Sequence, residues 1–107
     1  MRFEIILAPA AGRQLNSIRK DIRTGVRAGI ELHLRHEPTK VSKSRIKRLR
    51  GLEQPQYRLR IDEIRVFYDV TKASVEILAI VPKEQAQEWL DKEATRSSSG
   101  GSGPSKG

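Results

Sequence analysis

The chain has 107 residues, no cysteine and a formal net charge of +8, from 21 Lys and Arg against 13 Asp and Glu. This length fits one compact domain and leaves little room for a second. The absence of cysteine excludes disulfides, cysteine zinc sites and thiol nucleophiles, and the excess of basic residues points to an anionic partner. The apolar N-terminal stretch is too short for a signal peptide and no later run could span a membrane, so we expect a cytoplasmic protein.

The first part of the chain predicts one strand and two helices. Residues 3–8 form a short apolar run, which favours a strand. Further on, apolar residues recur three and four positions apart, as in amphipathic helices; they are Leu15, Ile18, Ile22, Val26, Ile30 and Leu34. We expect a break near Lys20, a second helix capped by Asp21, and its end at Glu37-Pro38.

The middle of the chain predicts a basic loop and then a hairpin. Residues 39–56 are polar and basic, and we expect a loop with a short strand around residues 46–49. Residues 57–61 and 64–68 alternate between apolar and polar, and Asp62-Glu63 between them suits a two-residue turn.

The last part predicts a buried strand and a closing helix. Residues 75–81 are almost wholly apolar, which favours a strand inside the sheet, and Pro82 suits the first turn of the helix that follows. Ala86, Trp89 and Leu90 would give this helix one apolar side. We expect a domain over residues 1–95 and a disordered Gly/Ser-rich tail over residues 96–107, whether linker or natural tail.

Alternation within the hairpin gathers three arginines on one face. Arg58 and Arg60 would share this face with Arg65 and Phe67, while the apolar residues and both tyrosines point the other way. If the turn is at residues 62–63, Arg60 lies opposite Arg65, and like charges so opposed cost stability. We infer that the arginines serve an external anion, for which phosphate is the natural candidate.

The segment around this hairpin is the most basic part of the chain. Guanidinium forks match phosphate oxygens and can oppose the charge that builds up in phosphoryl transfer, and Phe67 could stack on a nucleobase. Further candidates for RNA binding come from the preceding loop and strand; they are Lys43, Arg45, Lys47, Arg48 and Arg50. The alternative is a solvated face whose arginines pair with Asp62, Glu63 or Asp69.

Other polar residues carry weaker signals. His33 and His36 have no acidic pair with ligand spacing near them, so we expect no metal site. Lys83 follows Pro82, where a cation is slightly unfavourable at a helix N-terminus. Trp89 is expected to anchor the core, because indole has no useful acid or base function.

Over residues 2–93 the chain resembles the RelE/ParE superfamily of type II toxins, and more closely its RelE-like, mRNA-cleaving branch. Four passages carry the resemblance: Lys47-Arg48-Leu49-Arg50-Gly51-Leu52, Tyr57-Arg58-Leu59-Arg60, Ile64-Arg65-Val66-Phe67-Tyr68-Asp69-Val70, and Val75-Glu76-Ile77-Leu78-Ala79-Ile80-Val81. The resemblance implies an α+β fold: a small twisted antiparallel sheet of about four strands, packed by two N-terminal helices, with a C-terminal helix.

The resemblance also implies an activity. RelE-like toxins are metal-independent endoribonucleases without cofactors that cleave mRNA in the ribosomal A site by attack of the ribose 2′-hydroxyl. Arg58 and Arg60 match basic residues of the catalytic strand, and Arg65 matches the arginine that grips the scissile phosphate. Lys83 falls near a basic residue that protonates the leaving 5′-oxygen. Trp89 falls near the place of a catalytic tyrosine in some members, which is a departure from the pattern.

The departures raise the question of the general base. Arginine cannot readily accept a proton, because its pKa lies above about 12. Our hypothesis is that the three arginines stabilise the phosphorane and that Lys83 handles a proton. Tyr57 and Tyr68 are weaker candidates, since alternation turns both toward the core.

Two other functions remain open at this stage. A ParE-like inhibitor of DNA gyrase shares the fold and has no nuclease chemistry, and a third reading is an inactive module that only docks on RNA. Either toxin function implies a cognate antitoxin that covers the basic groove in a hetero-oligomeric complex, and charge complementarity gives this pairing a physical basis.

Overall fold

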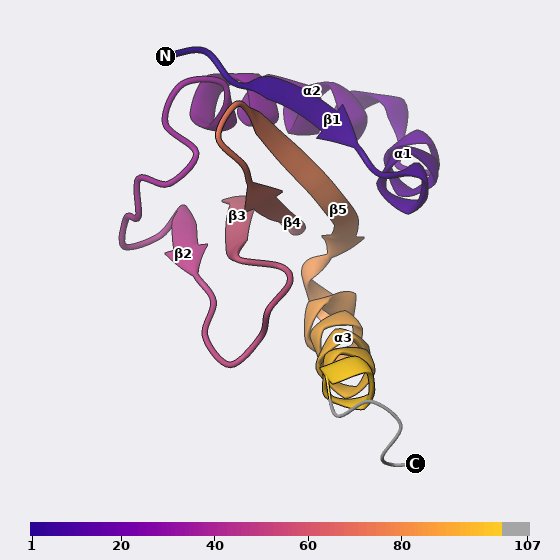
Figure 1. The fold of residues 1–107 in the computed structure, drawn as a ribbon. Coiled ribbons are helices and arrows are strands. Elements are labelled where there is room, and N and C mark those ends of the chain that lie inside the picture. Colours follow the sequence, from indigo (N-terminus) through magenta and orange to yellow (C-terminus); the bar gives the residue numbers. More distant parts are fainter. Residues whose placement is uncertain (102–107) are drawn as a thin grey trace.

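The computed structural model describes the backbone of residues 1–101 and the side chains of residues 1–95 (Figure 1). The elements follow in the order β1 (Glu4–Leu7), α1 (Pro9–Asn16), α2 (Lys20–Leu34), β2 (Ile46–Arg48), β3 (Tyr57–Ile61), β4 (Ile64–Val70), β5 (Ser74–Pro82) and α3 (Lys83–Gly101). Element types and order agree with the sequence prediction. Residues 102–107, part of the tail expected to be disordered, lie outside the described residues.

The strands form one five-stranded sheet in the order β1-β5-β4-β3-β2. All neighbours are antiparallel except β1, which pairs parallel to β5. The α+β fold class is confirmed, but the sheet has five strands where the resemblance implied about four, and β1 pairs parallel rather than antiparallel. Alternation within a strand gives its buried face but not its neighbour, so the sequence pattern could not fix this pairing.

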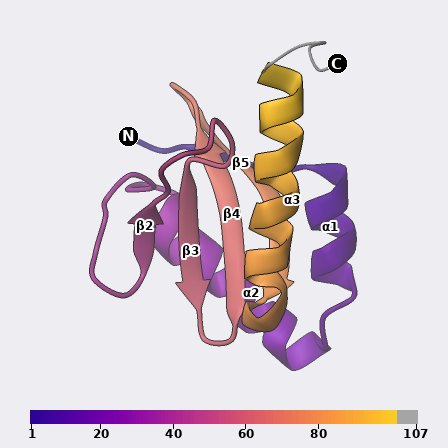
Figure 2. The same cartoon turned by 90° about the horizontal axis from the view of Figure 1, so that it is seen from below.

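The helices cover opposite faces of the sheet (Figure 2). Helices α1 and α2 pack on one face, where Leu15, Ile30, Leu59, Val66 and Tyr68 belong to the larger core cluster. Helix α3 lies on the other face, over a second and smaller apolar cluster. The molecule thus has three layers, and α3 leaves the β3 side of its sheet face uncovered (Figure 2).

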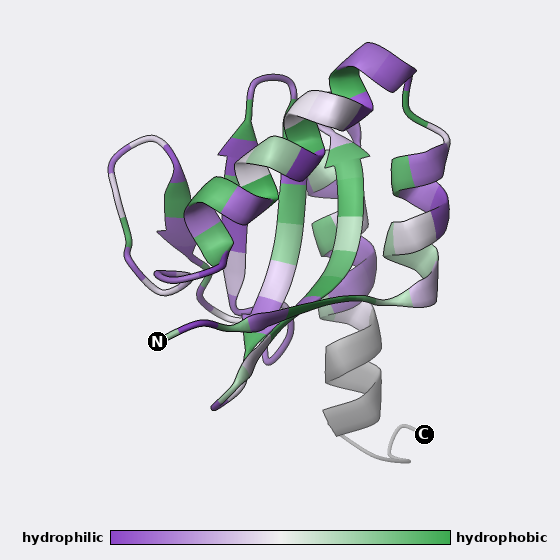
Figure 3. Ribbon diagram, turned by 90° about the horizontal axis from the view of Figure 1, so that it is seen from above, coloured by the Kyte–Doolittle hydropathy of each residue, from purple (hydrophilic) through white to green (hydrophobic). Residues whose placement is uncertain are grey.

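Apolar residues concentrate on the central strands, whereas the helices alternate between hydrophilic and hydrophobic positions (Figure 3). This distribution is that of a domain whose sheet is buried between helices. Within residues 1–101, no helix combines the length and the apolar character needed to cross a bilayer.

Several predicted boundaries differ in detail. Helix α2 has Arg19 at its N-cap position, and Asp21 forms an ion pair with Arg19 from the first turn instead of capping the helix. The same helix ends at Leu34, before the residues expected to terminate it. Pro82 is the last residue of β5, where its missing N–H costs no ladder bond, and helix α3 begins one residue later.

The C-terminal boundary also differs. Helix α3 continues to Gly101, beyond the end expected for the folded domain near residue 95. The sequence predicts a disordered tail from residue 96, because its Ser- and Gly-rich composition buries nothing, whereas the helix continues over residues 96–101.

Candidate functional site

The three arginines gather as the alternation predicted. Residues Tyr57 and Ile61 pair with Tyr68 and Ile64, so Arg60 lies directly opposite Arg65 across the hairpin. Arg58 pairs with Phe67 on the same face. Arg60 is exposed, while Arg58 and Arg65 are half-buried. We call these three residues the arginine cluster.

Within the described residues, no carboxylate forms an ion pair with the arginine cluster. Asp69 is buried and accepts hydrogen bonds from the Gln56 backbone N–H at 2.7 Å and from Gln54 Nε2 at 2.8 Å. Glu63 pairs with Lys83 instead. Asp62 accepts from Arg65 Nη1 at 2.8 Å, but through its backbone carbonyl. Among the described residues, the arginines therefore do not form the ion pairs of the alternative interpretation, although the charges of Arg65 and Arg60 lower the pKa of Glu63.

Arg58 shows most clearly that the cluster is uncompensated. Its Nε is buried and has no hydrogen-bond partner among the described residues. Burial lowers the pKa of Arg58, and the neighbouring charges of Arg65 and Arg60 lower it further. A cationic group in this position gains from a bound anion, which would offset both the burial and the repulsion.

The fold brings Lys83 to the turn of the hairpin, next to the arginine cluster. Its Nζ lies 2.9 Å from Glu63 Oε1, and its backbone N–H donates to the Glu63 carbonyl at 2.8 Å. The hydrogen bond and charge of Lys83 lower the pKa of Glu63, with smaller effects from Arg65 and Arg60. The sequence analysis missed this role of Glu63. It depends on the pairing of Ile64 with Pro82, which places the start of β4 beside the end of β5 and which the sequence pattern does not reveal.

Phe67 is not available to a nucleobase in this structure. Its ring is fully buried and stacks on Trp89, with ring centroids 4.8 Å apart and an interplanar angle of 13°. The prediction that Phe67 stacks on a base is therefore wrong for this conformation, because helix α3 covers that end of the face. Trp89 anchors α3 to the sheet, as its indole suggested.

Neither tyrosine reaches the arginine cluster. Tyr68 is fully buried on the opposite face and donates its hydroxyl to the Pro38 carbonyl at 2.7 Å. Burial raises the pKa of Tyr68 far above its ordinary value. Tyr57 stacks on Tyr68 at a centroid distance of 5.4 Å. Both side chains belong to the core, so neither supplies an acid or base at the arginines.

The other basic candidates are divided between the two faces. Lys47 pairs with Arg58 in the ladder and extends the arginine cluster onto β2. Arg48 pairs with Tyr57 and lies 5.0 Å from the centre of its ring, on the opposite face. The remaining three, Lys43, Arg45 and Arg50, are exposed in the flanking loops.

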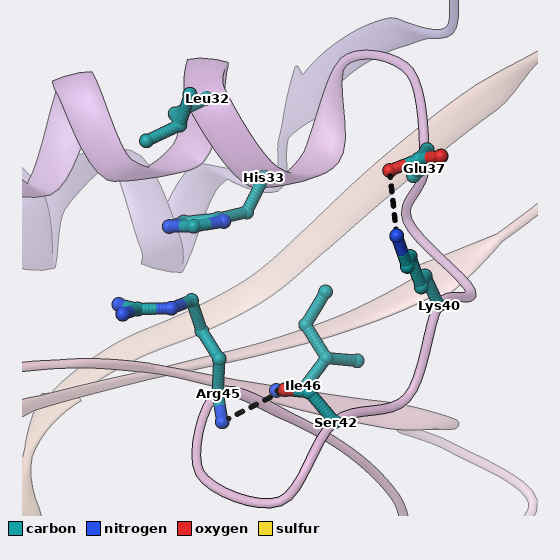
Figure 4. A pocket seen from close by; sticks show the side chains of 7 residues that line it. All are labelled: Leu32, His33, Glu37, Lys40, Ser42, Arg45 and Ile46. Carbon is teal, nitrogen blue, oxygen red and sulfur yellow. Dashed lines mark hydrogen bonds and ion pairs between the residues drawn. The ribbon is translucent and has the colours of Figure 1, made fainter.

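Arg45 lies between two pockets at this edge of the sheet. The first has a volume of about 240 Å³ and places the Arg45 side chain below the ring of His33, with Lys40 and Glu37 at its rim (Figure 4). Burial and the charge of Arg45 lower the pKa of His33. The second, of about 250 Å³, is lined by Ser44, Arg45, Arg60 and Asp62 and so touches the arginine cluster.

Among the described residues, no three His, Cys, Asp or Glu side chains gather closely enough to hold a metal ion. The fold instead brings together a set of cations, with Glu63 paired to one of them; the cations are the three arginines, Lys47 and Lys83. Their arrangement can bind an anion and stabilise negative charge that develops on it.

Comparisons by sequence and by structure give different results. No family model matches the chain, and no curated protein matches its sequence. Solved structures do match its fold, and three of them are described below. The toxin–antitoxin complex RelBE2 from Mycobacterium tuberculosis has a TM-score of 0.62 at 21% identity, over 77% of this chain and 99% of the matched chain.

Two further matches are also RelB–RelE complexes. The RelE–RelB complex from Pyrococcus horikoshii OT3 has a TM-score of 0.63 at 23% identity, over 78% of this chain and 97% of the matched chain. The RelB–RelE antitoxin–toxin complex from Methanococcus jannaschii has a TM-score of 0.59 at 16% identity, over 78% of this chain and 96% of the matched chain. At these identities the likeness establishes the fold. The chain has the fold of a chain in each of these toxin–antitoxin complexes, which agrees with the RelE-like fold that its sequence passages implied.

Proposed function

We propose that the chain is the toxin of a type II toxin–antitoxin system and acts as a metal-independent endoribonuclease on mRNA in the ribosomal A site. Two findings support this proposal: the fold is shared with chains from three RelB–RelE complexes, and its open sheet face carries an arginine cluster. A +8 protein of this kind is expected in the cytoplasm, where messages are translated.

The observation that carries the proposal is Arg60 directly opposite Arg65 with no carboxylate paired to either in the described residues. Opposed cations are unfavourable in the free protein and become favourable when a phosphate lies between them. In the reaction, the 2′-hydroxyl loses its proton to solvent water as its oxygen bonds to phosphorus, the bond to the 5′-oxygen breaks, and a 2′,3′-cyclic phosphate forms. Arg58, Arg60 and Arg65 stabilise the negative charge of the phosphorane.

Lys83 is the proton donor for the leaving 5′-oxygen in this proposal. Its ion pair with Glu63 holds Nζ at the turn end of the arginine cluster. Donation from Lys83 to the 5′-oxygen leaves a 5′-hydroxyl on the downstream product. The arginines do not serve as the base for the 2′-hydroxyl, because guanidinium does not give up its proton near neutral pH.

The proposal includes a cognate antitoxin. An acidic segment of that partner would compete with RNA for the same cations, and complementary charge would speed their association. The expected result is a toxin–antitoxin hetero-oligomer in which the arginine cluster is covered.

The test is expression of the chain in growing bacteria, with primer extension on abundant messages. We expect growth arrest and new 5′ ends within translated codons, both absent from an Arg65→Ala variant. Growth arrest with intact messages and inhibited gyrase supercoiling would instead support the ParE-like function. Binding to RNA without either effect would reduce the chain to a docking module.

A further inference from the structure

The turn of the β3–β4 hairpin carries a carboxylate that the proposed reaction does not use. Asp62 is exposed, its carboxylate forms no ion pair within the described residues, and it stands among three arginines. A negative charge beside a phosphate site weakens phosphate binding, so its presence there calls for a reason.

The turn itself explains only part of this choice. Asp62 has a φ of 51°, a conformation that Asn, Asp and Gly tolerate better than other residues. Asn or Gly would make the same turn without adding negative charge. The backbone therefore accounts for a small residue at this position but not for a carboxylate.

The surroundings of Asp62 suit a nucleobase. It lines a polar pocket of about 250 Å³ together with Ser44, Arg45 and Arg60. Its carbonyl accepts a hydrogen bond from Arg65 Nη1 at 2.8 Å, which ties the turn to the arginine cluster. A base attached to a phosphate held by Arg60 and Arg65 would lie within reach of this pocket.

From this arrangement we propose that Asp62 recognises guanine in the nucleotide next to the phosphate held by the arginine cluster. An ionised carboxylate only accepts hydrogen bonds, through two oxygens side by side. Guanine alone presents two adjacent donors on its Watson–Crick edge, N1–H and the N2 amino group. The other three bases each place an acceptor beside their donor, which a carboxylate would leave unpaired.

The rest of the pocket complements the other edge of guanine. Its O6 and N7 atoms are acceptors, and arginine is their commonest protein partner. The donors available in the pocket are the guanidinium groups of Arg45 and Arg60 and the hydroxyl of Ser44. The pocket therefore offers acceptors where guanine has donors and donors where it has acceptors.

This inference rests on the proposed function for its biological meaning, but it is tested by binding alone. The purified chain, without a partner, is titrated at low ionic strength with four labelled five-nucleotide RNAs that differ only in the central base. We expect the guanine RNA to bind about 10-fold more tightly than the other three, as one bidentate contact typically gives.

Two substitutions keep the turn and change the carboxylate. Asp62→Gly should abolish the preference among bases, and Asp62→Asn should shift it toward adenine, whose donor and acceptor match an amide. Glu53→Gln, an exposed residue outside the pocket, removes the same charge and should leave the guanine preference unchanged. Equal binding of the four RNAs by the wild type, or a guanine preference that survives in both Asp62 variants, would overturn the inference.

Failure of this inference differs from failure of the proposed function. If the four RNAs bind equally while cleavage of translated messages depends on Arg65, the nuclease function is supported and guanine recognition by Asp62 is contradicted. If guanine is preferred but no message is cleaved, guanine recognition by Asp62 is supported and the nuclease function is contradicted.

Discussion

Arg60 and Arg65 oppose each other across the hairpin, and this costs stability in the free protein. Arg60→Gln removes the repulsion and keeps a polar strand residue. We expect the free energy of unfolding to rise by about 0.2–1 kcal/mol, while RNA binding weakens. Urea denaturation followed by circular dichroism measures the change. Lys72→Gln, which removes an exposed charge in the β4–β5 turn, should leave stability nearly unchanged; a less stable Arg60→Gln would contradict the account.

Asp69 gives a prediction about how the stability of the folded protein depends on pH. Burial raises the pKa of its carboxyl, although hydrogen bonds from Gln56 and Gln54 oppose this. The folded state therefore binds the proton more tightly than the unfolded state, whose pKa is about 3.9. Stability from this group is lost as the pH rises from about 4 through the raised pKa.

Asp69→Asn removes this titration and keeps one acceptor for the Gln56 N–H. The unfolding free energy of the variant relative to wild type should therefore increase as pH rises from about 3 to about 7. Chemical denaturation of both proteins at a series of pH values provides the comparison. A difference that stays constant with pH, or falls, would contradict the role given to burial.

The type and position of an element were predictable where the hydrophobic pattern of that segment alone is sufficient to define a strand or a helix. The hairpin register followed from period-two alternation and a two-residue turn, because a slip of one residue would expose the apolar set. Contacts between distant elements were not predictable in this way. The parallel pairing of β1, the cover of Phe67 by Trp89, and the ion pair between Glu63 and Lys83 all depend on which elements become neighbours.

Two glycines of helix α2 differ in a way that the sequence does not reveal, and they allow a matched test of how closely α2 packs on β3. A Cβ on Gly25 would meet no atom within 4 Å, whereas one on Gly29 would lie 2.7 Å from Ile61 Cδ1 and 3.0 Å from its Cγ1. Gly25→Ala should stabilise the protein by about 0.5–1 kcal/mol through helix propensity. Gly29→Ala should be less stable than Gly25→Ala by at least about 1 kcal/mol, because β3 packs against that position.

Thermal denaturation of the two glycine variants measures this difference directly. Both substitutions are the same change in the same helix, so they differ only in what lies above the new methyl group. Equal stability of the two variants would mean that α2 does not approach β3 as closely as described.

At the scale of the whole molecule, RNA binding depends on the net charge and on where the cations lie more than on any single ion pair. Helix α3 lies over one part of its sheet face and leaves the β3 side uncovered (Figure 2). Arg60 is exposed there, and Arg58 and Arg65 are half-buried. The sequence gives the net charge of +8, but only the packing of α3 decides which cations remain accessible. Phe67 lies on the predicted face but is covered by Trp89 of α3, because helix cover is a property of the assembled fold.

This arrangement predicts how binding depends on salt. If Arg65 contacts an RNA phosphate, Arg65→Ala should reduce the slope of log K against log salt concentration by about 0.7, the value for one contact on a single strand. Fluorescence anisotropy with a labelled single-stranded RNA over a range of salt concentrations gives both slopes. If the slope of Arg65→Ala equals that of the wild type, Arg65 does not contact an RNA phosphate.

The most direct measurement is cleavage of a ribosome-bound message by the purified chain. Wild type should cut within the A-site codon, and Arg65→Ala should be slower by about 10²–10³-fold, as expected when one donor to a developing charge is lost. Lys72→Gln serves as the charge-matched control and should cleave normally. Cleavage by a folded Arg65→Ala protein at the wild-type rate would contradict the claim that the arginine cluster holds the scissile phosphate.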